Sequence, residues 1–131
     1  MAGLVSLILM LHSINRWLIV VAAIVALVVY AMTWLNNSPM GQNRRPMMIY
    51  TGLMDLQVLL GAIVLVGMAA YPRYQLEHAT TNLIAVLLAH FLPRLRAATP
   101  QAQARNNVLA VVVSILIIVA GVAVLPQGWF G

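Results

Sequence analysis

Four long apolar segments alternate with short polar stretches along this chain of 131 residues. The segments cover about residues 4–35, 46–70, 75–95 and 108–125. Each approaches or exceeds the roughly 20 residues that an α-helix needs to cross a hydrocarbon core of about 30 Å. The pattern therefore predicts an all-α membrane protein, with a single domain over residues 1–131 built as a bundle of four transmembrane helices.

Turn-forming and helix-breaking residues mark the ends of these segments. Pro46 suits the opening position of the second helix, and residues 71–74 interrupt the chain before the third with two tyrosines of an interfacial kind. Pro93 falls in the last turn of the third helix, and the polar residues 97–107 predict a solvent-exposed connection. The aromatic tail at residues 126–130 is expected at a lipid–water boundary.

Composition fits a membrane solvent and excludes several kinds of chemistry. Hydrophobic residues make up 63% of the chain and charged residues only 7%, whereas an average soluble domain has about 25% charged residues. All seven basic residues are arginines scattered between apolar segments, so the net charge of +5 does not predict nucleic-acid binding. The absence of cysteine excludes disulfides, iron–sulfur clusters and covalent heme attachment.

The arginines also predict the orientation of the helices. Only Arg73 lies in the connection on one side, while five arginines lie in the two connections on the other: Arg44, Arg45, Arg94, Arg96 and Arg105. Because positive charge accumulates on the cytoplasmic side, both chain termini are expected outside. The predicted location is the bacterial inner membrane, with the termini on the periplasmic side.

Ionisable and amide side chains inside the apolar segments are the candidate functional residues, since such groups are costly in hydrocarbon and are retained for a reason. There are nine of them: His12, Asn15, Arg16, Asp55, Gln57, Glu77, His78, Asn82 and His90.

Arg16 and Asp55 are expected to form an intramembrane ion pair. At about 1.5 Å per residue, Arg16 lies about 18 Å deep counted from Leu4, and Asp55 about 17 Å from the outer face. Either charge alone would be costly in hydrocarbon. The pair would be a structural clasp between the first two helices or part of a proton or ligand site.

His12 and His78 are the candidate ligands of a heme, which needs two axial side chains from different helices at similar depth. Asn82 lies one helical turn after His78, and Glu77 is placed to orient an imidazole. With a helix start at Leu4, however, His12 lies about 9 Å deeper than His78, so heme ligation competes with the ion pair.

His90 cannot share a metal with His78, because the two are about 18 Å apart along one helix. A heme could instead use His90 with one of three methionines, Met47, Met48 or Met54.

Small residues are expected to form packing seams. Gln57 and Gly61 share one face of the second helix, and Ala110, Ser114 and Gly121 nearly align on the fourth.

Residues 11–17 carry the pattern His-Ser-x-x-Arg-Trp at the start of the first membrane helix. This pattern, together with residues 55–61, Glu77-His78 and the later His90, resembles small bacterial four-helix membrane proteins labelled cytochrome b-like. The resemblance implies ligation of heme b and exchange of electrons with quinone or a partner protein.

Three functions are consistent with the sequence. The chain would be a heme-binding membrane subunit of a respiratory or photosynthetic electron-transfer complex, a cofactor-free accessory or assembly subunit of such a complex, or a proton or ion pathway through His12, Arg16, Asp55 and His78. Membrane lipid and the subunits of that larger complex are the expected partners. A stand-alone enzyme is not expected, since no nucleophile motif is present.

Overall fold

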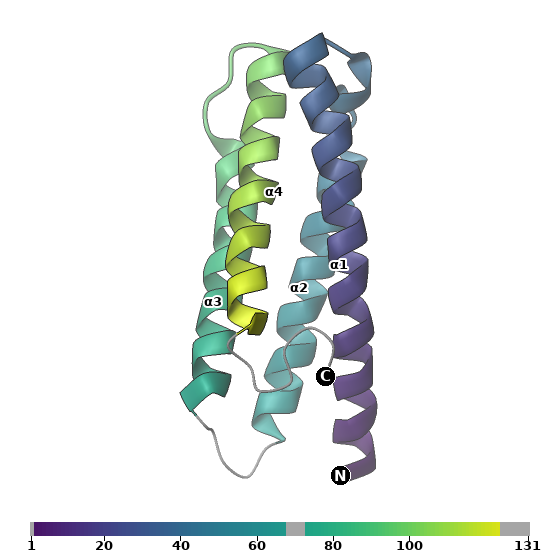
Figure 1. The fold of residues 1–131 in the computed structure, drawn as a ribbon, viewed down its shortest axis with the longest axis vertical. Coiled ribbons are helices and arrows are strands. Elements are labelled where there is room, and N and C mark those ends of the chain that lie inside the picture. Colours follow the sequence, from purple (N-terminus) through teal and green to yellow (C-terminus); the bar gives the residue numbers. More distant parts are fainter. Residues whose placement is uncertain (1, 68–72, 124–131) are drawn as a thin grey trace.

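The computed structural model describes residues 2–67 and 73–123, which form a bundle of four helices running alternately up and down (Figure 1). The helices are α1 (Ala2–Asn36), α2 (Arg45–Val66), α3 (Arg73–Phe91) and α4 (Pro100–Ala123). Each packs against the next along the chain, and α4 closes the ring against α1. Consequently α1 and α3 face each other across one diagonal of the bundle, and α2 and α4 across the other.

The helical fold class is confirmed. Among the described residues there is no strand, and α1, α2 and α4 are each long and apolar enough to cross a membrane. The start of α1 and the end of α4 lie at the same end of the bundle, where α1 reaches beyond the other helices (Figure 1). The structure therefore has the four helices that the apolar segments predict.

Most helix boundaries lie close to those predicted. Helix α1 covers residues 2–36 where 4–35 was expected, and α2 begins at Arg45, one residue before Pro46. The predicted end of α2 near residue 70, most of the break at residues 71–74 and the aromatic tail at 126–130 lie outside the described residues.

The prediction of a solvent-exposed connection over residues 97–107 was wrong for most of its length, because α4 begins at Pro100. Pro100 suits a first helical position, and Thr99 caps the helix by accepting a hydrogen bond from the Ala102 amide at 3.0 Å. Asn106 and Asn107 are 4% and 7% exposed. Their polarity therefore reflects contacts inside the protein and not exposure to solvent.

Side chains in the first turns of α4 hydrogen-bond to the segment that follows α3. Helix α3 ends at Phe91, earlier than the expected residue 95, because Pro93 lies in a short 3₁₀ helix over Leu92–Arg94. The Gln103 amide donates to the Pro93 carbonyl at 2.7 Å, and the Asn106 amide donates to the Leu95 carbonyl at 3.1 Å. The first turns of α4 thus satisfy carbonyl groups that the early end of α3 leaves free.

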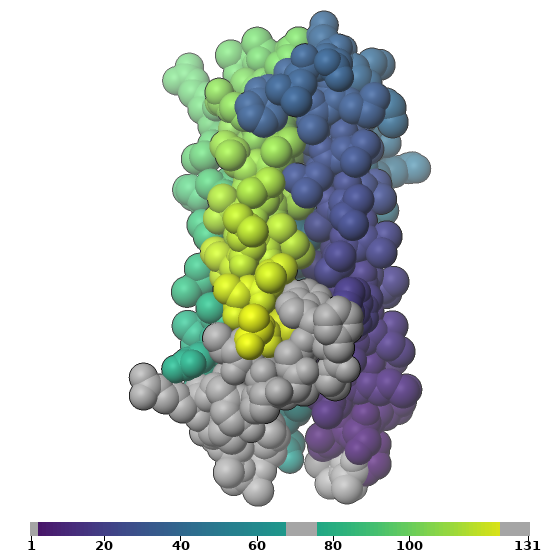
Figure 2. All heavy atoms as spheres, in the orientation of Figure 1, coloured from purple at the N-terminus to yellow at the C-terminus, as the bar shows by residue number. Residues whose placement is uncertain are grey.

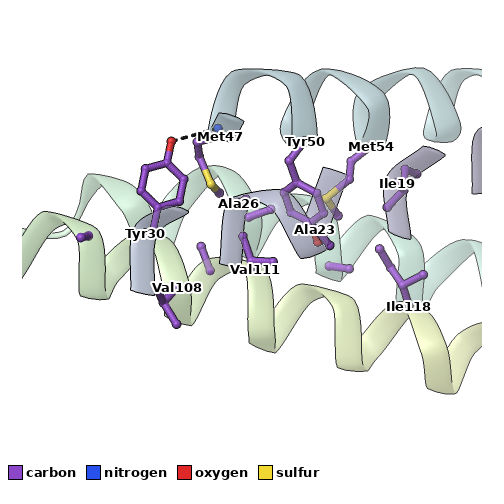
Figure 3. Close-up of a cluster of buried hydrophobic side chains, with 14 of the residues drawn as sticks. Ile19, Ala23, Ala26, Tyr30, Met47, Tyr50, Met54, Val108, Val111 and Ile118 are labelled. Atoms are coloured by element: carbon purple, nitrogen blue, oxygen red, sulfur yellow. Dashed lines mark hydrogen bonds between the residues drawn. The ribbon is translucent and has the colours of Figure 1, made fainter. Parts of the chain in front are cut away.

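Aromatic hydroxyl groups organise the core between α1, α2 and α4 (Figure 3). The Tyr30 hydroxyl donates to the Asn43 carbonyl at 2.9 Å and accepts from the Met47 amide at 3.0 Å, which fixes the start of α2 against α1. Across the core, the Tyr50 hydroxyl lies 2.6 Å from Ser114 Oγ. Along α1 and α4 the side chains pack tightly over the half of the bundle away from the start of α1 (Figure 2).

The Tyr50–Ser114 hydrogen bond should couple α2 and α4 energetically. Ser114 also lies 2.6 Å from the Ala110 carbonyl, so its hydroxyl donates there and accepts from Tyr50. Ser114→Ala should cost about 1–3 kcal/mol, because the fully buried Tyr50 hydroxyl loses its acceptor. The double variant with Tyr50→Phe should cost less than the two single losses added, by about 1 kcal/mol. Reversible unfolding in detergent, followed by helicity, measures this, and strictly additive losses would contradict it.

Candidate functional site

His12 of α1 and His78 of α3 meet in the interior of the bundle. Their ring centroids are 6.2 Å apart and the ring planes are nearly perpendicular, at 87°. The offset in depth counted from the sequence is absent because α1 reaches beyond the other helices at this end (Figure 1). The structure therefore brings together the two histidines that the sequence predicted as heme ligands, across the α1–α3 diagonal. We refer to His12 and His78 as the histidine pair.

Hydrogen bonds define the tautomer of His78. Its Nδ1 lies 3.2 Å from the Gly121 carbonyl oxygen, which can only accept, so Nδ1 carries the proton. Its Nε2 lies 3.3 Å from the Asn82 amide nitrogen, which can only donate. The Nε2 lone pair therefore points toward the Asn82 amide. A backbone carbonyl that accepts from one ring nitrogen is the usual support of a histidine whose other nitrogen binds a metal.

Gln57 of α2 contacts His12 at its backbone carbonyl and at its ring. The Gln57 side-chain nitrogen donates to the His12 backbone carbonyl at 3.0 Å and lies 3.4 Å from His12 Nε2. The Gln57 oxygen accepts from the Asn15 amide at 2.9 Å, and that amide also donates to the Leu53 carbonyl at 2.9 Å. Because its oxygen accepts from Asn15, Gln57 presents only N–H groups to His12, and the Nε2 lone pair of this imidazole points toward the Gln57 amide.

Glycines face the histidine pair from the other two helices. A Cβ atom on Gly61 of α2 would lie 3.4 Å from His12 Cε1, and a Cβ atom on Gly121 of α4 would lie 3.9 Å from His78 Nδ1. Both positions therefore lie directly beside an imidazole and carry no side chain. Of the small-residue seams expected on these helices, Gly61 and Gly121 thus lie beside the histidine pair, whereas Ser114 contacts Tyr50.

Several buried polar atoms around the pair have no hydrogen-bond partner in the described structure: His12 Nδ1, Asn15 Oδ1 and Asn82 Oδ1. Buried polar atoms are nearly always hydrogen-bonded, so three such atoms in one region are unusual. Because they surround the two imidazoles, they indicate a place where a polar group or cofactor would be accommodated.

Asp55 pairs with His90 of α3, and not with Arg16 as expected from depth. Asp55 Oδ1 lies 2.8 Å from His90 Nε2. Helix α2 meets α1 through Gln57, and two residues along a helix correspond to about 200° of rotation. Asp55 therefore points away from α1, and the proposed pathway through His12, Arg16, Asp55 and His78 loses its carboxylate.

The other candidate residues are Arg16, Glu77 and the three methionines. The Arg16 guanidinium carbon lies 5.9 Å from the centroid of the adjacent Trp17 ring. Glu77 is exposed, and the partners of His78 are Gly121 and Asn82. Of the methionines considered as partners of His90, Met47 and Met54 are buried in the core and Met48 is exposed.

The histidine pair offers few ligands for a metal ion. Among the described residues, no group of three or more histidine, aspartate or glutamate side chains is placed to hold a metal ion. A bare zinc ion needs three or four protein ligands, whereas a heme iron takes four nitrogens from its own porphyrin and needs only two more. Two imidazoles are therefore too few for a bare zinc ion, but they are as many ligands as a heme iron needs from the protein.

No protein-family model, curated protein or solved structure matches this chain. A proposal for the function therefore rests on the chemistry of the histidine pair and its surroundings.

Gly121 should be required for the close approach of α4 to α3. A Cβ atom there would lie 2.8 Å from Thr81 Oγ1, and Thr81 is itself held by the Glu77 carbonyl at 2.6 Å. Gly121→Ala should lower the unfolding midpoint in detergent. Gly52→Ala is the matched control. A Cβ at Gly52 meets nothing within 4 Å, so this variant should gain up to about 1 kcal/mol of helix propensity. Equal gains in both variants would contradict this close contact.

Proposed function

We propose that this protein binds one heme b between His12 and His78 and carries electrons within the membrane. The supporting observation is the separation of 6.2 Å between the two ring centroids. At this separation His12 and His78 are the two side chains that would hold the heme, one from α1 and one from α3.

The surrounding residues fit such a group. The Gly121 carbonyl orients His78, Gln57 orients His12, and each Nε2 lone pair faces only an amide N–H at 3.3–3.4 Å. Those amide contacts are long and weak, so an iron would replace them at small cost. Gly61 and Gly121 leave the walls on α2 and α4 without side chains beside the pair. The heme would supply one-electron chemistry, and the chain would hold it and exclude water from it.

The partners follow from the shape of the molecule. The connections between helices are short, so little protein is available outside the bilayer to bind a soluble substrate. Electrons would therefore be exchanged with lipid-soluble quinone or with another membrane subunit. We place the chain as a subunit of a respiratory or photosynthetic electron-transfer complex.

A cofactor-free accessory subunit of such a complex is the second candidate, and one observation favours it. Both imidazoles already have amide partners from their own bundle, through Gln57 and Asn82. In this case the polar cluster would serve only to hold α1, α2, α3 and α4 in register.

Absorption spectroscopy separates the two candidates. The purified chain, expressed with ample heme supply, should show a Soret band and one heme per chain. His12→Leu and His78→Leu should each abolish the band, because each removes one axial ligand. Gly61→Leu should also reduce it, since a Cβ atom there already lies 3.4 Å from His12 Cε1 and a longer side chain would displace the imidazole.

The matched control is His90→Leu, which removes a histidine of the same helix but outside the pair and should keep the band. Helicity and elution volume report whether each variant folds. A folded wild-type chain without a Soret band, or a band that survives the loss of either His12 or His78, would contradict heme ligation by this pair.

We further propose that all four helices span a bacterial inner membrane and that both termini face the periplasm. The support is the excess of arginine at the end of the bundle where α1 ends and α4 begins.

Because the chain has no cysteine, single cysteines can test this orientation. Gln42→Cys and Ala98→Cys, both at exposed positions of the connections, should react with a membrane-impermeant maleimide only after cells are opened. Gly3→Cys should react in spheroplasts with an intact inner membrane, since it lies near the opposite end. The reverse pattern of labelling would place the termini inside.

A further inference from the structure

Asp55 of α2 and His90 of α3 form a second polar site, separate from the histidine pair. Their side chains are joined by a hydrogen bond of 2.8 Å, yet they remain 54% and 40% exposed, respectively. The site therefore opens to the outside of the bundle, at the seam between α2 and α3. The heme proposed above does not use it. We refer to these two residues as the Asp–His dyad.

The dyad joins the middle of α2 to the last turn of α3. Asp55 is ten residues into α2, about 15 Å from its start, whereas His90 lies one residue before the end of α3. One turn away on the same two helices, Leu59 and Leu87 are 57% and 59% exposed. An ionisable pair on such an apolar surface is costly in lipid and is a candidate functional site. A ligand that reaches the dyad along this surface would come from the lipid phase.

The hydrogen bond defines what the dyad offers to such a ligand. An ionised carboxylate only accepts, so His90 Nε2 carries the proton that it donates to Asp55. His90 Nδ1 then carries a lone pair, and in the described part of the chain it has no hydrogen-bond partner. A histidine oriented by a carboxylate through one nitrogen is the usual arrangement for accepting a proton at the other. The dyad therefore suits a ligand with an O–H donor.

We propose that the Asp–His dyad binds the head group of a hydroquinone that diffuses in the bilayer, with His90 Nδ1 accepting a hydrogen bond from a phenolic hydroxyl. A hydroquinone is soluble in lipid, and its flat ring suits the apolar flanks formed by Leu59 and Leu87. Its oxidised form has carbonyl acceptors but no O–H donor, so it binds less well.

This binding site rests on the electron-transfer function proposed above. It adds that the reduced form of the quinone is the species bound. Along α2 the dyad lies about 9 Å from Gly61, and along α3 about 18 Å from His78. The two sites are therefore distinct in space, and either can be tested without the other.

Photolabelling in lipid nanodiscs tests the proposal. The probe is an alkyl hydroquinone with a diazirine in its tail, and labelled peptides are mapped by mass spectrometry. The competitors are decyl hydroquinone and its dimethyl ether, which has the same ring but no O–H donor. Labelling should fall on α2 and α3, and the hydroquinone should compete at least about tenfold better than the ether, which corresponds to about 1.4 kcal/mol.

Variants connect this preference to the dyad. In His90→Leu the hydroquinone and the ether should compete equally, whereas Leu83→Ala, at an exposed position of α3 two turns from His90, should keep the preference. Helicity shows that both variants fold. Equal competition by the two compounds in the wild-type chain, or an unchanged preference in His90→Leu, would overturn the proposal.

Two further measurements separate this proposal from heme binding and from another occupant of the surface. His12→Leu should keep the preference for the hydroquinone even though it loses the Soret band, so a heme-free chain still reports on the dyad. If Leu59→Cys forms a disulfide between copies and labelling is insensitive to the hydroquinone, a second copy covers the dyad and the proposal is overturned.

Discussion

The hydrogen bonds of Gln57 are the interaction on which the arrangement of this bundle depends. In hydrocarbon, a buried amide must find its partners inside the protein. Gln57 does so by using both ends of its side chain on α1, at Asn15 and at the His12 carbonyl. Apolar helices can slide along each other at little cost, but these bonds exist at one register only. They therefore set the level at which His12 enters the bundle, and with it the distance to His78.

The sequence predicted the helices well because their apolar length is a direct consequence of the bilayer. It also predicted that His12 and His78 would be partners, since both are histidines near one end of the bundle. It failed for Asp55 because depth along a helix was counted and rotation around it was not. With Gln57 on the α1 side, Asp55 had to face elsewhere. The beginning of α4 was missed because Asn106 and Asn107 were interpreted as solvated, although they are buried.

Polar side chains divide this protein into an inner site and an outer site. The histidine pair lies on the α1–α3 diagonal and is closed by glycines of α2 and α4, whereas the Asp–His dyad opens toward lipid. Met54, Ile19 and Ile118 belong to the core cluster of the bundle (Figure 3). The Tyr50–Ser114 hydrogen bond joins α2 to α4. Under the two proposals above, the inner site would enclose the heme and the outer site would bind the hydroquinone.

The length of α1 has a consequence for the surrounding membrane. Its 35 residues correspond to about 52 Å, while the hydrocarbon core is about 30 Å thick. Tilt alone does not absorb this hydrophobic mismatch, because the common tilt of membrane helices is about 20°. The first turns, where Leu4 and Leu7 are 53% and 48% exposed, therefore extend an apolar surface beyond what a bilayer of that thickness covers. In a membrane, this end of α1 would be where the bilayer thickens locally or where another apolar surface covers the helix.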